Sequence, residues 1–101
     1  MRLCIIAACV TIDPAAMPGI ITTRVDDLTA GLALIRAEGC DCIVTPETIG
    51  EAASVSCLDV ARVARGYGVG CVIVTEHACD GPHGAVCLLP GGDLAQAVER
   101  A

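Results

Sequence analysis

Both histidines of the chain lie in one polar segment, residues 76–87, which also holds cysteines. His77, Cys79 and His83 of this segment could bind a metal ion. Imidazole and thiolate are ligands that zinc prefers, and a structural zinc site takes four ligands in a tetrahedral arrangement. The three residues are therefore candidate zinc ligands. Their spacing fits no standard finger or ribbon, so an ordinary polar loop between two strands is the alternative.

Two shorter patterns are similar to known functional motifs but do not match them. Cys40-Asp41-Cys42 is a C-x-C sequence, whereas a thioredoxin-like redox site needs C-x-x-C. The glycines at 66, 68 and 70 follow an expected helix and precede an expected strand, the reverse of the order in a dinucleotide-binding loop. We interpret the first as small residues at a strand start and the second as the end of a helix.

The chain contains eight cysteines but shows neither an export signal nor the spacing of a small disulfide-rich scaffold. We expect reduced thiols, a cytoplasmic or other reducing intracellular compartment, and no secretion. Five cysteines fall inside apolar runs, where a free cysteine behaves as a small hydrophobic residue. These are Cys4, Cys9, Cys42, Cys71 and Cys87.

The elements that must position these residues alternate between strands and helices. The unbroken apolar run from Leu3 to Val10 is typical of a strand buried on both faces. Helical spacing of apolar residues then predicts a helix from about Thr23 to Gly39. The later elements are expected to be a strand over 40–45, a helix from about 56 to 66, a strand over 71–75 and a strand over 85–89. The last segment, 94–100, fits a strand or a helix.

This order predicts one α/β domain over residues 1–101, with a β-α-β-α-β-β layer and a core of three parallel strands. Two helices on the same side cover only one face of such a sheet, yet the strands are apolar on both faces. We therefore expect another copy of the chain to cover the second face.

Charge and composition exclude several classes of partner. The net charge is −6, from 12 acidic residues against 6 arginines with no lysine, and 1% of the residues are aromatic. An acidic surface repels phosphate backbones and anionic membranes, and base stacking needs aromatic faces. No apolar stretch reaches the ~18 residues of a membrane span. We expect no nucleic-acid partner and no membrane insertion.

Several short sequences resemble the start of a nitrilase-superfamily (carbon-nitrogen hydrolase) domain. They are residues 1–3 (MRL), 38–47 (EGCDCIVTPE), 64–74 (ARGYGVGCVIV) and 88–94 (LLPGGDL). The resemblance implies half of an α-β-β-α sandwich and covers about the first third of the family's domain. That family uses a Glu, a Lys and a Cys, and Glu47 matches the position of the Glu, a general base. The chain has no lysine, and the family's nucleophile would lie beyond residue 101.

Without these groups, we expect a non-catalytic, homo-oligomeric nitrilase-like protein that serves as a small-molecule-binding or structural subunit. Its expected partner is itself, with a small molecule or a larger protein assembly as further possibilities, and no cofactor is expected apart from the zinc considered above. One alternative is an amide or nitrile hydrolase whose site joins Glu47 to Cys57 or Cys79 of a neighbouring subunit. The other is a metal- or redox-responsive protein centred on His77, Cys79 and His83.

Overall fold

The structure is a computed structural model that describes residues 1–7, 9, 18–47, 57–76, 81–89 and 91–101. Its centre is a five-stranded sheet in the order β2-β1-β3-β4-β5, and every neighbouring pair is parallel. The strands are β1 (Arg2–Ile6), β2 (Ile21–Val25), β3 (Cys42–Pro46), β4 (Gly70–Val74) and β5 (Val86–Leu88). This order is that of a doubly wound sheet, in which the chain reverses its direction of travel between β1 and β3.

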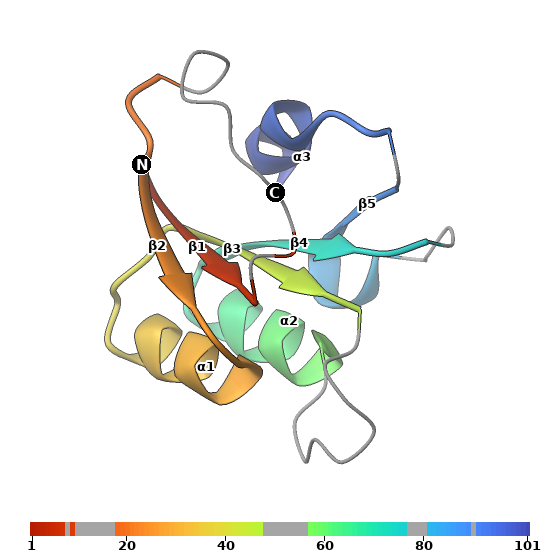
Figure 1. The fold of residues 1–101 in the computed structure, drawn as a ribbon. Helices are drawn as coiled ribbons and strands as arrows, with labels where there is room; N and C mark the ends of the chain where they lie inside the picture. Colours follow the sequence, from red (N-terminus) through yellow and green to blue (C-terminus); the bar gives the residue numbers. More distant parts are fainter. Residues whose placement is uncertain (8, 10–17, 48–56, 77–80, 90) are drawn as a thin grey trace.

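Helices lie on both faces of the sheet (Figure 1). α1 (Leu28–Arg36) and α2 (Cys57–Gly66) pack side by side on one face. α3 (Leu94–Arg100) packs on the opposite face, and a single 3-10 turn, η1 (Pro82–Gly84), precedes β5. Within the described residues, no helix is long and apolar enough to cross a membrane.

Each face of the sheet has its own core of buried residues. The core under α1 and α2 is made chiefly of Cys4, Ile6, Leu28, Leu32, Ile35, Ile43, Val60, Ala64, Cys71 and Ile73. The core under α3 is made of Leu3, Ile5, Cys42, Val44, Val72, Leu88, Ala97 and Val98. Ile5, Val44 and Val72 in this second core are 0% exposed in the single chain. The apolar second face, which we expected a second copy to cover, is therefore buried within the chain.

Three elements differ from the sequence-based expectation. The helix predicted from Thr23 begins instead at Leu28, because the Asp27 side chain accepts a hydrogen bond of 2.8 Å from the Ala30 N–H and caps it there. Thr23 belongs to β2 and pairs with Cys4. The parallel core has five strands rather than three. Residues 94–100, for which the sequence left a strand and a helix open, form a helix whose start is capped by Asp93.

Candidate functional site

A polar pair lies where β3 and β4 end, at the carboxyl edge of the sheet. Thr75 Oγ1 donates a hydrogen bond of 2.7 Å to Glu47 Oε2, and the Glu47 N–H donates one of 3.0 Å to the Val74 carbonyl. Thr75 is 5% exposed, whereas Glu47 is exposed. In doubly wound sheets ligands bind at this edge, beside the point where the strand order reverses. Glu47, the candidate catalytic base, is thus placed at an edge where such folds have their sites.

Cys57, the first residue of α2, lies in the same chain and close enough to Glu47 for that carboxylate to act on it. Burial raises the pKa of the Cys57 thiol, and the negative charge of Glu47 raises it further. A nucleophilic cysteine needs the opposite, a lowered pKa that yields thiolate at neutral pH. The Glu47 and Cys57 pair therefore does not have the electrostatics of an activated nucleophile.

The other described cysteines belong to the cores or lie near them. Burial raises the pKa of Cys4, Cys42 and Cys71 to about 12 in each case. These three are free thiols that behave as small hydrophobic residues, as expected.

Cys87 does not follow that expectation, because it takes part in a disulfide bond. It lies in β5 at the edge of the sheet and is only partly buried. An edge position leaves its sulfur accessible to another part of the chain, which the fully buried core cysteines are not. The prediction of a reduced thiol at Cys87 is therefore wrong.

Of the three candidate zinc ligands, the structure places only His83. His77 and Cys79 lie outside the described residues, so the zinc site stays a prediction. Among the residues that the structure does describe, no group of three or more His, Cys, Asp or Glu side chains is arranged to hold a metal ion.

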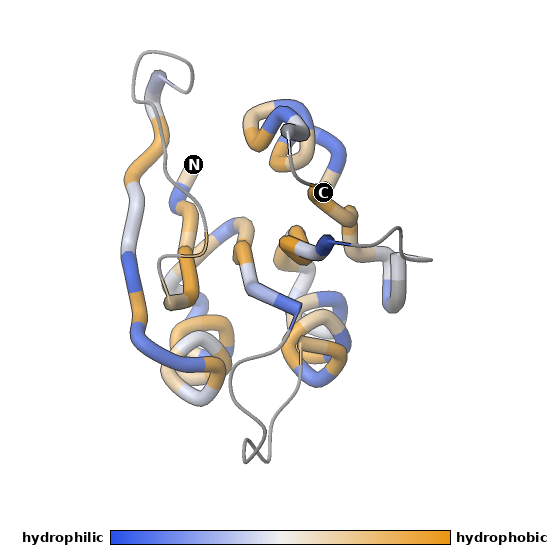
Figure 2. The backbone as a smooth tube through the Cα atoms, turned by 45° about the vertical axis from the view of Figure 1, so that its right-hand side comes forward, coloured by the Kyte–Doolittle hydropathy of each residue, from blue (hydrophilic) through white to orange (hydrophobic). Residues whose placement is uncertain are grey.

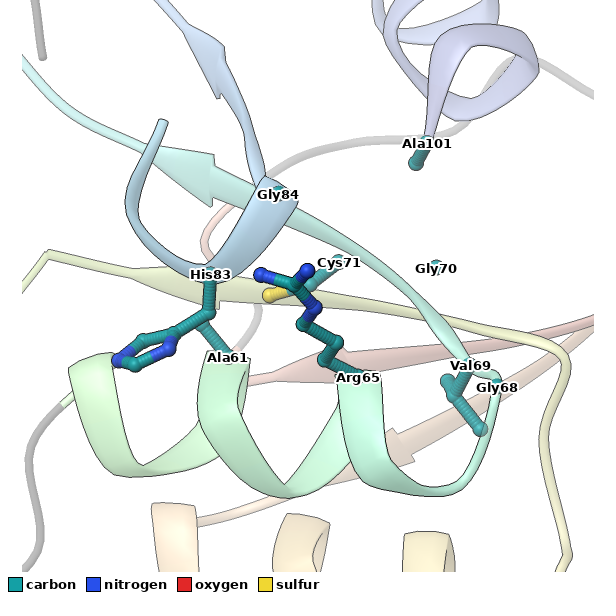
Figure 3. A pocket seen from close by; sticks show the side chains of 9 residues that line it. All are labelled: Ala61, Arg65, Gly68, Val69, Gly70, Cys71, His83, Gly84 and Ala101. Atoms are coloured by element: carbon teal, nitrogen blue, oxygen red, sulfur yellow. The ribbon is translucent and has the colours of Figure 1, made fainter. Parts of the chain in front are cut away.

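His83 instead lines a cavity of about 390 Å³ between α2, η1 and the start of β4 (Figure 3). Its described lining consists of Ala61, Arg65, Gly68, Val69, Gly70, Cys71, His83, Gly84 and Ala101. The cavity has a simple origin. Parallel strands are usually joined by a full crossover helix, whereas the described part of the connection from β4 to β5 contains only the single turn η1. One turn fills less of the space beside α2 than a helix would.

Two basic side chains line this cavity. Arg65 extends from the last turn of α2 with its guanidinium beside Cys71, and the His83 side chain points from η1 toward α2 (Figure 3). Neither forms a hydrogen bond or an ion pair with the residues that the structure describes, whereas Arg62 of the same helix is paired with Asp59 at 3.1 Å. The described lining contains no carboxylate side chain.

The backbone at His83 is unusual and helps to place its side chain. His83 has a φ of 53°, in the left-handed region that favours glycine, and the nearby Gly81 and Gly84 have φ values of 64° and 78°. Strained backbone at a residue other than glycine persists where the surrounding structure holds it, and it gathers at binding and catalytic sites. At this turn, histidine occupies a position where glycine would be less strained, and its imidazole lines the cavity.

A second cavity, of about 400 Å³, lies at the amino ends of β1 and β3, but its basic group is already occupied. Arg2 forms an ion pair of 3.2 Å with Asp41 and donates a further hydrogen bond of 2.8 Å to the Glu38 carbonyl. Asp41 in turn has its pKa lowered by the hydrogen bonds from Arg2. The cavity at Arg65 and His83 is therefore the better candidate for a charged ligand.

Sequence reasoning missed Arg65 and took the glycines that follow it only as the end of a helix. A signal was present, because Arg65 shortly precedes the strand at 70–74 and His83 shortly precedes the strand at 86–88. The amino ends of neighbouring parallel strands share one edge of a sheet. The missing information was that these two strands are neighbours.

The chain matches no family model, no curated protein and no solved structure. The resemblance to the nitrilase superfamily therefore remains a prediction from short sequence segments.

Proposed function

We propose that this chain is a non-catalytic small-molecule-binding module and that its ligand is a small anion carrying a phosphate or carboxylate group. The observation behind the proposal is that Arg65 and His83, both without a partner among the described residues, line the same cavity. Guanidinium binds planar or tetrahedral oxyanions with paired hydrogen bonds, and imidazole adds a donor.

The size and walls of the cavity agree with this ligand class. Its volume of about 390 Å³ falls within the range of roughly 300–1,000 Å³ that is typical of small-molecule sites. Gly68, Gly70 and Gly84 add no side chains to the wall, which leaves room for a ligand beside Arg65. Their own N–H groups already donate to carbonyls of the chain, so the side chains of Arg65 and His83 would supply the donors. Ala101 closes the wall beside Gly70, away from the Arg65 guanidinium (Figure 3).

Thiol chemistry favours binding over catalysis. Cys71 lies in the cavity wall, and burial raises its pKa to about 12, so it stays a neutral thiol at physiological pH. Burial and the negative charge of Glu47 also raise the pKa of the Cys57 thiol. Hydrolysis by a cysteine nucleophile needs a thiolate, which neither environment provides.

The test is a titration with inorganic phosphate, pyrophosphate and citrate, followed by NMR chemical-shift changes and calorimetry. We expect the wild type to bind at least one of these anions with shifts centred on residues 65–71 and 83–84. Arg65→Gln should weaken that binding about tenfold or more, since a charge-assisted hydrogen bond contributes about 1.5–3 kcal/mol.

The matched control is Arg62→Gln, one turn earlier on α2, where the arginine is already paired with Asp59. It removes the same charge from the same helix and should leave the affinity nearly unchanged. Equal weakening in both variants would reduce the effect to general electrostatics, and no binding of any of these anions by the wild type would overturn the proposal.

A further inference from the structure

β2 forms one edge of the sheet and is open to solvent. Four of its five residues are exposed, and Ile21 is 67% exposed, the highest value among the large hydrophobic residues with notable exposure. In Figure 2, no described segment lies beyond β2 on its outer side. An open edge strand carries a row of main-chain groups that can pair with another strand.

The register with β1 shows which main-chain groups of β2 point outward. The Ile21 N–H donates to the Met1 carbonyl at 2.9 Å, and the Val25 carbonyl accepts from the Ala7 N–H at 2.8 Å. Because the main-chain groups of successive strand residues point to alternate sides, those of Ile21, Thr23 and Val25 face β1. Those of Thr22 and Arg24 therefore face away from the sheet.

We propose that a second copy of this chain pairs with β2 through an antiparallel β2–β2 contact centred on Thr23. In this register the outward groups of Thr22 exchange both hydrogen bonds with Arg24 of the second copy, and Thr23 lies opposite Thr23. The contact is isologous, so it closes after two copies and joins the two sheets into one. The partner is thus the one expected from the sequence, but it meets the sheet at an edge and not at a face.

The side chains of β2 are complementary to themselves in this register. Ile21 lies opposite Val25 of the second copy, so the most exposed apolar side chain of the strand gains an apolar neighbour on the face that carries α1. Thr23 faces Thr23 on the two-fold axis, a favourable pairing between strands. Arg24 lies opposite Thr22 of the second copy, so the strand's only charge is not placed directly opposite itself.

The opposite edge of the sheet offers much less to a partner. β5 has three residues, and none of them is fully exposed. Strands this short form weak pairs by themselves. This contrast, together with the self-complementary sequence of β2, favours pairing through the β2 edge. The inference is independent of the anion site, because no residue lining that cavity belongs to β2.

The sharpest test places charges on the two-fold axis. Thr23→Lys and Thr23→Asp each put like charges opposite each other, so each variant alone should be monomeric by light scattering under conditions where the wild type is dimeric. A mixture of the two should recover the dimer, because Lys then faces Asp. We expect at least a tenfold rise in the dimer dissociation constant for each variant alone. Gln96→Lys and Gln96→Asp, at an exposed position of α3, carry the same charge changes away from β2 and should remain dimeric.

A second variant keeps the proposal testable if charge disturbs β2 itself. Thr22→Pro removes an N–H that points away from β1, so it should block pairing between copies and leave the β1–β2 hydrogen bonds intact. Circular dichroism checks that the fold is retained. A wild type that is monomeric, or Lys and Asp variants that fail to recover a dimer when mixed, would overturn the inference.

Discussion

The hydroxyl of Thr75 donates a 2.7 Å hydrogen bond to the carboxylate of Glu47 and links the ends of β3 and β4. These residues are 28 positions apart in the sequence, and the parallel pairing of the two strands brings them together. The same pairing sets Pro46 beside Val74. The residues that follow them, Glu47 and Thr75, therefore come at the same position along the two strands. Glu47 is therefore held by the fold and is not a freely solvated loop carboxylate.

Removing the Thr75 hydroxyl should destabilise the fold. Thr75→Val keeps the shape of the side chain but leaves Glu47 without this donor, and we expect the free energy of unfolding to fall by about 1 kcal/mol. Glu47→Gln should cost less, because its amide oxygen still accepts. Urea unfolding measures both. Thr29→Val, at an exposed position of α1, is the control, and an equal loss there would mean that the hydrogen bond contributes nothing specific.

Replacing His83 by glycine should stabilise the fold while weakening anion binding. The φ of 53° is strained for histidine and free for glycine, and relief of that strain should raise the free energy of unfolding by up to about 1 kcal/mol. Thermal unfolding measures the change. Gly84→Ala, in the same turn with a φ of 78°, should move the midpoint the other way. A destabilised His83→Gly protein would show that the imidazole itself supports the turn.

Two helical glycines should respond oppositely to alanine. A Cβ at Gly31 would lie 2.6 Å from Ile6 Cδ1 and 3.2 Å from Ile43 Cδ1, both in side chains that are 0% exposed. With little room to shift, Gly31→Ala should cost about 1–3 kcal/mol. A Cβ at Gly66 would meet nothing within 4 Å, so Gly66→Ala should be neutral or stabilise by up to about 1 kcal/mol. Denaturant unfolding of both variants makes the comparison, and a Gly31→Ala protein as stable as wild type would show that α1 can move off the sheet.

Stability should fall at alkaline pH. Burial raises the pKa of Cys4, Cys42 and Cys71 to about 12, above the ordinary thiol value. From about pH 8.5 upward the unfolded chain releases these protons and the folded chain keeps them, so the free energy of unfolding falls as the pH rises. Each thiol can contribute up to about 1.4 kcal/mol per pH unit in that window.

Urea unfolding under reducing conditions at about pH 8 and about pH 10 measures this slope. Cys71→Ala removes one of the three thiols and should make the slope shallower by one group's share. A slope that does not change in the variant would mean that Cys71 is not the neutral buried thiol described above.

The sequence by itself determined the local elements whose signals are local. The apolar runs at 3–10, 40–45 and 71–75 indicate buried strands because apolar residues on both faces of a strand require cover on both, and β1, β3 and β4 overlap these runs. The spacing of Leu28, Leu32 and Ile35 indicates the buried side of α1 for a similar reason. Glu47 was identified at a strand end, and the structure keeps it there.

Only the tertiary structure decided what depends on which strands are neighbours. β2 has the sequence Ile-Thr-Thr-Arg-Val with four exposed residues, so no buried pattern marks it, and it is a strand because β1 provides its hydrogen bonds. The covering of the second face by α3 and the meeting of Arg65 with His83 likewise follow from the sheet order. Hydrogen-bond pairing between distant segments leaves little trace in local sequence, because backbone groups are the same in every residue.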